Sequence, residues 1–311
     1  MDLTVSGIEK LCNELLCHIF RLAIESDITG SDNPATPCHL AAVCRRWREI
    51  SLRTANLWTC FVIGSGKDHR CKLREDVCTT NQVAILRCCL KLPRSKNLPI
   101  HIDITHSSNW CIKYMLRALA RDTHRCGSLR FHPRAERFSI SDFGQQLYPG
   151  SHFAALRRLD YHCDFDNDRL YLLGPQFDSS SLQSLTSLRL VDWIGKMGTD
   201  TSFPWAQLKQ ISLAEFKGCQ DDLLRLFQAC PSITHFALSS DRTFLSDFHW
   251  DEFTLDSIVL PTLIHLEIEL GWDGEDGNTP QHGPLLDILG CIRIPKLTRP
   301  SFRQLHPLLF P

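Results

Sequence analysis

The second half of the chain repeats one short apolar pattern, in which three apolar residues are separated first by two residues and then by one. The pattern occurs five times, at Leu156/Leu159/Tyr161, Leu185/Leu188/Leu190, Leu208/Ile211/Leu213, Ile233/Phe236/Leu238 and Leu263/Leu266/Ile268. Successive copies start 29, 23, 25 and 30 residues apart. The last two apolar residues alternate as a half-buried strand requires, and the first is placed to bury the turn that leads into the strand. Since one such unit cannot bury its apolar face alone, we expect the units to stack into a curved solenoid with parallel strands.

Turn and helix signals between the copies agree with this pattern. A proline stands shortly before three of the strands, at Pro204, Pro231 and Pro261, where a missing N–H donor is tolerated. Other regular elements are predicted as helices at Thr80–Leu92, Asn109–His124, Asp221–Ala229 and Pro284–Leu289, and as strands at Leu98–Ile104 and Ser128–Phe131. The upstream strand, helix and strand form one further, longer unit of the same kind.

The first sixty residues have a different, helical pattern. In the predicted first helix, Leu15, Ile19 and Leu22 recur at spacings of four and three, and Leu16, Phe20 and Ala23 repeat that spacing one residue later. A cluster of helix-breaking residues, 31–34, separates it from a second helix, which Thr36 can cap and Pro37 can begin. The second helix has one apolar face, made of Leu40, Val43, Cys44, Trp47 and Ile50. The basic run around Trp47 is expected to be a solvated helix face.

This order of elements resembles the F-box, the module through which a substrate receptor docks on the Skp-type adaptor of a cullin-based ubiquitin ligase. The residues that carry the resemblance are Ile8, Leu11, Glu14, Leu15, Leu16, Ile19, Phe20, Leu40, Val43, Cys44, Arg45, Trp47, Leu57 and Trp58. The insert 27–34 is similar to the version found in mushroom-forming fungi. The family usually has Leu-Pro before the first helix, whereas Cys12 follows Leu11 here. Because proline rigidifies that turn, its absence is expected to weaken adaptor binding without removing the apolar face.

The resemblance implies a division into three parts. Residues 1–63 would be the F-box, residues 64–97 a linker helix region, and residues 98–311 a substrate-recognition domain similar to leucine-rich repeats. The repeats lack the usual Asn or Cys after the strand, and Trp193 and Phe216 stand near that position instead. The expected fold class is therefore α/β, with a three-helix F-box followed by an irregular solenoid with a parallel sheet. An ordinary α/β domain with several leucine-bearing strands is the alternative, and it would also contain a parallel sheet.

Composition and charge indicate the compartment in which the protein resides and the classes of partner that are not expected. A net charge of −1 gives no electrostatic case for nucleic acid or for a membrane surface. The start lacks the build of a signal peptide, and no run approaches the roughly 18 apolar residues that span a bilayer. Fifteen cysteines in a chain of this length, without paired spacing, indicate reduced thiols. We therefore expect a cytoplasmic or nuclear protein with no nucleic-acid or membrane partner.

No catalytic or cofactor pattern emerges. The run Gly64-Ser65-Gly66-Lys67 fails as a phosphate-binding loop, since Phe61 takes the place of its first glycine and Asp68 that of the Ser or Thr that holds Mg²⁺. The sequence contains no Cys-x-x-Cys, and its 14 histidines form no pair with the spacing of zinc ligands on a helix. A non-catalytic protein without cofactor or metal is expected.

The function expected from the resemblance is recruitment of a target protein to a Skp–cullin–F-box ubiquitin ligase. Residues expected to form or support the adaptor-facing surface are Leu11, Leu15, Leu16, Ile19, Val43, Trp47 and Trp58, with Leu15, Ile19 and Trp47 as anchors. Exposed positions beside the strands, such as Arg157, Arg189 and His265, are candidates for contact with a target. Two alternatives to this function stay open. In the first, the chain is a diverged F-box protein that does not assemble with a cullin. In the second, it is a repeat scaffold whose N-terminal helices only cap the repeats.

Overall fold

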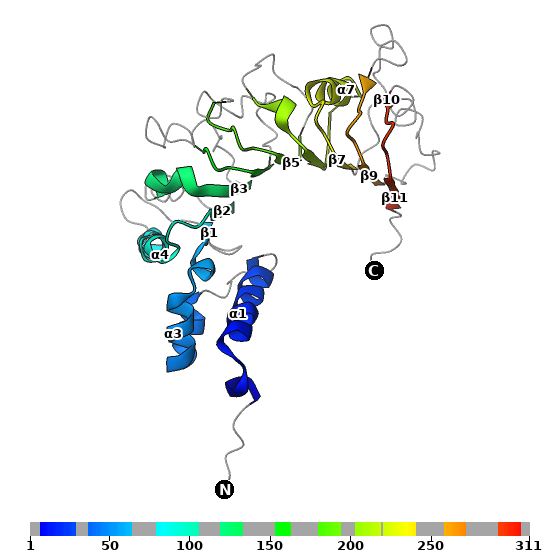
Figure 1. Ribbon diagram of the computed structural model, residues 1–311. Coiled ribbons are helices and arrows are strands. Elements are labelled where there is room, and N and C mark those ends of the chain that lie inside the picture. The colour runs from blue at the N-terminus through cyan, green and yellow to red at the C-terminus, as the bar shows by residue number, and fades with distance from the viewer. Residues whose placement is uncertain are drawn as a thin grey trace.

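The computed structural model places short N-terminal helices before a long curved band of parallel strands (Figure 1). It describes residues 7–28, 37–63, 79–105, 119–132, 153–162, 180–193, 203–218, 220–240, 258–271 and 292–305. The predicted helix at Pro284–Leu289, the cap at Thr36 and the glycine-bearing run at 64–67 lie outside these residues. So does most of the predicted helix Asn109–His124, whose last part is the 3-10 helix η3 (Ala120–Arg125).

The N-terminal helices form one unit, residues 7–58, which we call the helical unit. Its elements are η1 (Gly7–Lys10), α1 (Asn13–Ile28), α2 (Pro37–Val43), α3 (Arg45–Arg53) and η2 (Ala55–Trp58). The prediction of one continuous helix after Pro37 is wrong. Cys44 has extended backbone, with φ −155° and ψ 171°, and its Sγ accepts a hydrogen bond from Trp47 N. The thiol therefore caps a separate helix, α3, at a point that the apolar spacing crosses without interruption.

The helical unit has a small core of its own. Its buried apolar residues are Leu16, Phe20, Ile24, Ile50, Leu57 and Trp58. The ring of Phe20 packs at 4.7 Å from the ring of Trp47, and Trp58 Nε1 donates to Ser51 O at 2.7 Å. The Cys17 thiol and the Thr54 hydroxyl lie 3.3 Å apart and link α1 to the turn after α3. The described residues of this core thus all belong to the helical unit, and none comes from the sheet.

In the part of the chain that the structure describes, the main sheet has nine strands, all parallel, and their order in space follows their order in the chain. They are β1 (Cys60–Ile63), β2 (Ile100–Thr105), β3 (Cys126–His132), β4 (Arg158–His162), β5 (Ser187–Val191), β6 (Gln210–Ala214), β7 (His235–Ser240), β9 (His265–Gly271) and β11 (Arg299–Leu305). The sheet follows a curve that begins beside the helical unit (Figure 1). A parallel pair, β8 (Ile258–Val259) with β10 (Ile292–Arg293), forms a second sheet. The expected α/β class with a parallel sheet is confirmed.

All five copies of the repeated pattern enter strands as predicted. The first apolar residue of each copy, which precedes the strand, is fully buried, and its N–H closes a tight turn onto the carbonyl three residues earlier. The next residue's carbonyl accepts two backbone N–H bonds, of 2.8–3.1 Å, from the equivalent place in the following unit. The residues that supply these carbonyls are Arg157, Thr186, Lys209, Thr234 and Ile264. Backbone hydrogen bonds thus link neighbouring units already in the turns that precede the strands.

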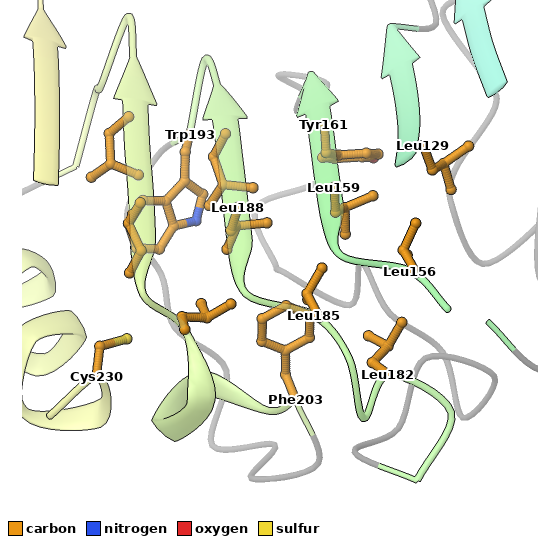
Figure 2. Close-up of a cluster of buried hydrophobic side chains, with 14 of the residues drawn as sticks. Leu129, Leu156, Leu159, Tyr161, Leu182, Leu185, Leu188, Trp193, Phe203 and Cys230 are labelled. Carbon is orange, nitrogen blue, oxygen red and sulfur yellow. The ribbon is translucent and has the colours of Figure 1, made fainter. Parts of the chain in front are cut away.

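One continuous core runs under the sheet from β1 to β9. Figure 2 shows side chains from successive strands and turns lying next to one another in it, including Leu156, Leu185 and Trp193. Trp193 and Phe216, which stand where the repeat family has Asn or Cys, are both buried, with ring centroids 5.5 Å apart. Each follows a residue with positive φ, Asp192 (58°) and Glu215 (53°). This left-handed turn directs the aromatic ring into the core, where it fills space rather than binding the backbone.

Helices connect the units on the outer side. The predicted helices at Thr80–Leu92 and Asp221–Ala229 are observed as α4 (Thr79–Arg94) and α7 (Gln220–Ala229), and a 3-10 turn, η5 (Trp205–Gln207), precedes β6. α7 covers the outside of the band near β7 (Figure 1). Strand β11 was not predicted, and neither were β8 and β10.

Thiol burial gives a direct test of this fold. Burial raises the pKa of the Cys88, Cys126 and Cys230 thiols to about 12, so that only about one in 10⁴ is ionised at pH 8. We expect iodoacetamide at pH 8 to leave these three unmodified in the native protein while it alkylates the exposed Cys12, Cys38, Cys44 and Cys89. Peptide mass spectrometry with and without denaturant measures the difference. Rapid native labelling of Cys126 or Cys230 would contradict this packing.

Candidate functional site

An exposed apolar face on the helical unit is the first candidate site. Leu15, Ile19 and Leu22 lie on one side of α1, and Leu15 and Ile19 are 51% and 39% exposed. Val43, at the end of α2, is 61% exposed. Ile8 and Leu52 are also exposed. Large apolar side chains in this number on a unit of about fifty residues are typical of an interaction surface.

The structure divides the predicted adaptor-binding residues into three groups. Leu15, Ile19 and Val43 point to solvent. Leu11 and Trp47 are half-buried against the core of the helical unit. Leu16 and Trp58 lie inside that core, with 0% and 2% of their surface exposed, and support the outer residues from beneath. Leu22 and Leu52 were not among the predicted residues, although Leu22 continues the stripe of Leu15 and Ile19.

Arginine side chains hold this face together. The Arg46 guanidinium donates to the Leu11 carbonyl and to Asn13 Oδ1, which ties α3 to the start of α1. Arg48 Nε donates to the Ala41 carbonyl at 3.0 Å and so fixes α2 against α3. Arg45 and Arg48 are exposed, as the interpretation of the basic run as a solvated helix face predicts, whereas Arg46 is partly buried.

The start of α1 is well formed despite Cys12. The Cys12 carbonyl accepts a hydrogen bond from Leu16 N at 3.1 Å, as a residue just before a helix does. Hydrogen bonds from the backbone N–H of Glu14 and from the Cys12 thiol lower the pKa of the exposed Glu14 carboxylate. A negative charge in the first turn of a helix is favourable. The cysteine thus keeps the first turn of α1 in place, although it lacks the stiffness of proline.

The helical unit is joined to the sheet by several contacts. The Arg94 guanidinium of α4 lies over the Trp58 ring at 5.0 Å, and Lys91 Nζ donates to the Cys60 carbonyl at 2.9 Å. His101 N, in β2, donates to the Thr59 carbonyl at 2.9 Å, and β1 pairs with β2 from Cys60 onward. Because side-chain and backbone bonds meet around the end of η2, the helical unit has a defined orientation on the first strands.

A second candidate site is the open face of the sheet, opposite the main core. One residue from each of four neighbouring strands forms a row of alternating charge, Asp103, Arg130, Asp160 and Arg189, which we call the polar row. Arg130 lies 3.2 Å from Asp103 and 3.1 Å from Asp160, and Arg189 lies 3.6 Å from Asp160. Both aspartates are more than nine-tenths buried. The row is thus a set of cross-strand ion pairs that the sequence did not reveal.

The candidate target-contacting residues lie along this open face or at its edge. Arg189 belongs to the polar row, and the ring of His265 stacks on that of His235 at 5.6 Å. Arg157 is exposed in the turn before β4. Further along, at the end of β5, the buried Asp192 carboxylate receives Lys217 Nζ and lies 2.7 Å from His162 Nε2. These contacts brace neighbouring strands.

The described residues contain no group of three or more His, Cys, Asp or Glu side chains that could hold a metal ion. Among the helices in the same part of the chain, none has the length and apolarity needed to cross a membrane. The exposed apolar residues of the helical unit and the open face of the sheet are the two candidate surfaces, and α4 also exposes Leu86 and Leu90. Comparison of the chain with protein-family models gives no match, and neither does comparison with curated proteins.

Proposed function

We propose that this protein is the substrate-recruiting subunit of a Skp–cullin–F-box ubiquitin ligase. The helical unit would bind the Skp-type adaptor, and the sheet, read as an irregular leucine-rich-repeat-like solenoid, would bind a target protein. In this role the chain itself does no chemistry. It raises the effective concentration of the target near a ubiquitin-charged enzyme. The observation that carries the proposal is that the apolar side chains of Leu15, Ile19 and Val43 are exposed on a unit whose core is already closed.

The energetics of that face favour a protein partner. Full burial of a large apolar side chain in an interface stabilises the complex by about 1.5–3 kcal/mol. Leu15 and Ile19 stand one helical turn apart, so both can enter the same groove of a partner. Leu16 and Phe20, fully buried beneath them, fix the helix that carries both anchors. An interface of this kind depends on a few central anchors within a ring of less important contacts.

The firm junction with the sheet also suits the proposal. A receptor must hold its target at a defined place relative to the adaptor, because a freely rotating linker would dilute the gain in effective concentration. Here Arg94 over Trp58 and the pairing of β1 with β2 connect the helical unit to the first strands without an intervening free segment. The same contacts would transmit the adaptor's position to the open face of the sheet.

Co-purification with the adaptor tests the proposal. We expect the full chain to capture a Skp-type adaptor, and the Leu15→Asp/Ile19→Asp variant to lose this capture. Burying a carboxylate at an apolar interface is far more costly than the roughly 2 kcal/mol expected for truncating an anchor. The matched control is Leu86→Asp/Leu90→Asp, the same change at the same spacing on the exposed face of α4. The control variant should capture the adaptor as the unaltered chain does.

The components that come with the adaptor separate the alternatives. Capture of adaptor together with cullin supports a ligase subunit. Capture of adaptor without cullin supports a diverged F-box protein and contradicts ligase assembly. No capture by a chain with native circular dichroism would contradict the proposal and favour a repeat scaffold. Equal loss of capture in the α4 control would show that the α1 face is not the specific docking surface.

A further inference from the structure

A cleft of about 980 Å³ lies where the helical unit meets the open face of the first strands. Arg21 and Leu57 line it from the helical unit, Arg130 and Asp160 from the polar row, and Arg157 and Arg158 from the start of β4. Its volume is at the upper end of the range for ligand pockets. It is formed by two parts of the chain that are held in fixed orientation by the contacts around η2. A ligand in this cleft would therefore meet a preorganised surface.

The cleft has an excess of positive charge. Among the described residues that line it are four arginines, at 21, 130, 157 and 158, and two aspartates, at 103 and 160, which leaves two positive charges with histidine neutral. Arg130 engages both aspartates. Arg157 and Arg158 are exposed, and neither guanidinium forms an ion pair with a described residue. Arg157 and Arg158 thus contribute two adjacent, exposed positive charges to the cleft.

We propose that this cleft binds an acidic segment of a polypeptide, with Arg157 and Arg158 pairing with its carboxylates. Guanidinium groups form paired, charge-assisted hydrogen bonds with carboxylates, which gives geometric specificity as well as attraction. The proposal rests on the target-binding half of the proposed function and names the chemistry of the target. It does not require the adaptor, which would bind the exposed face of α1 and α2.

A polypeptide fits the cleft better than a nucleic acid does. No Phe, Tyr or Trp is among the described lining residues, so the base stacking that supports single-strand binding has no platform there. The net charge of the chain, −1, also lacks the basic excess that is typical of nucleic-acid binding.

Fluorescence anisotropy on the full chain tests the assignment. The probe is a fluorescein-labelled peptide of twelve residues that alternates Glu and Gly, and its counterpart alternates Lys and Gly. We expect the acidic peptide to bind, with an affinity that falls as salt is raised, and the basic peptide not to bind. The Arg157→Glu/Arg158→Glu variant should weaken acidic-peptide binding by about tenfold or more. The Lys/Lys variant keeps the charge but not the paired hydrogen bonds, so its affinity should lie between that of the Glu/Glu variant and that of the unaltered chain.

The matched control reverses two arginines outside the cleft. Arg299 occupies the same place on β11 as Arg158 does on β4, as the strand register shows, and Arg225 is exposed on α7. The Arg225→Glu/Arg299→Glu variant has the same change in net charge and should bind the acidic peptide within about twofold of the unaltered chain. An Arg157→Ala/Arg158→Ala variant provides a second test with less disturbance of the fold. It should lose binding in the same direction.

Three results would overturn the proposal. They are equal binding by the cleft and control variants, no binding of the acidic peptide by the natively folded chain, and stronger binding of a twelve-nucleotide single strand than of the peptide. Peptide binding with no adaptor capture would leave the cleft assignment standing and remove the ligase. Adaptor capture that survives in a chain unable to bind the peptide would remove the cleft assignment alone.

Discussion

Trp58→Ala is expected to lower the free energy of unfolding of the helical unit by about 3–5 kcal/mol, as for other buried large-to-small changes. The Trp58 side chain is 2% exposed and fills the centre of the small core with Leu16 and Phe20. Its Nε1–H donates to the Ser51 carbonyl, and Arg94 lies over its ring. Alanine would leave a cavity, an unpaired carbonyl and an unsupported guanidinium at the junction with α4.

The loss should be local, because the helical unit and the sheet have separate cores. Native-state hydrogen exchange measures it. We expect amide protection to fall in α1 and α3 and to be kept in β4 to β7. Trp47→Ala is the matched control, since Trp47 is half-buried on the outside of the same core. It should cost less stability while still weakening adaptor capture, if Trp47 is an anchor as predicted.

An equal fall in protection along the sheet would contradict the separation of the two cores. No measurable fall in α1 and α3 would contradict the central place of Trp58. The comparison also distinguishes residues that support the fold of the helical unit from residues that would contact the adaptor. A buried supporting residue such as Trp58 should lower capture only as far as it unfolds the unit, whereas Val43→Asp should lower capture with hydrogen exchange unchanged.

The repeated strands could be predicted because burial there follows a simple rule. Leu185, Leu188 and Leu190 each occupy a position that only an apolar residue can fill, and the same three positions recur at a nearly constant spacing. Strand β11 could not be predicted, because Pro300 pairs with Leu266, where the pattern requires a strand former. Proline is accepted there because β11 is the last strand of the described sheet, and an edge strand tolerates a missing donor.

The helical unit was predicted as a set of elements but not as a surface. In α1, two apolar stripes lie one residue apart, Leu15 and Ile19 in one and Leu16 and Phe20 in the other. Spacing alone does not say which stripe faces the core, because both are equally apolar. That choice depends on α3 and η2, whose Ile50, Leu57 and Trp58 meet the second stripe. The helix break at Cys44 was not predicted for a similar reason, since the apolar spacing continues across it and a thiol is not a usual helix cap.

The polar row was missed because its members lie 27–30 residues apart and become neighbours only through strand register. Each charged residue, taken singly, fits a solvated strand position. The structure shows instead that Asp103 and Asp160 are buried and depend on Arg130 between them. Sequence alone gives no means of telling a paired strand charge from a solvated one when the pairing is between distant segments.

Arg130→Met is expected to destabilise the sheet by about 2–3 kcal/mol. Burial by itself opposes the charge on Arg130, but the Asp103 and Asp160 carboxylates outweigh it and raise the pKa of the guanidinium. Without Arg130, two nearly buried carboxylates would face each other with no cation between them. Breaking a fully buried pair costs about 3–5 kcal/mol, and the lower figure here allows for solvent screening of the Arg130 side chain, which is 37% exposed.

The triple variant Asp103→Leu/Arg130→Met/Asp160→Leu should recover most of that loss. Replacing a whole buried ionic group by apolar residues is often close to neutral in stability, whereas removing one partner is not. We expect the triple variant to unfold in urea within about 1 kcal/mol of the unaltered chain. If the triple variant is as unstable as Arg130→Met, the loss arises from packing of the arginine stem rather than from the unpaired carboxylate charges.

The pH dependence of stability also distinguishes unpaired carboxylate charge from lost packing of the arginine stem as the cause of the deficit. The pKa of Arg130 is raised in the folded state, so its contribution to stability is complete at every pH below its unfolded value and is lost only in strong alkali. The deficit of Arg130→Met should therefore be the same at pH 7 and pH 9. It should be smaller in acid, where protonation removes the carboxylate charge that Arg130 offsets. Urea unfolding at pH 7 and pH 3.5 measures this, and a deficit that does not change with pH would show that charge is not what Arg130 supplies.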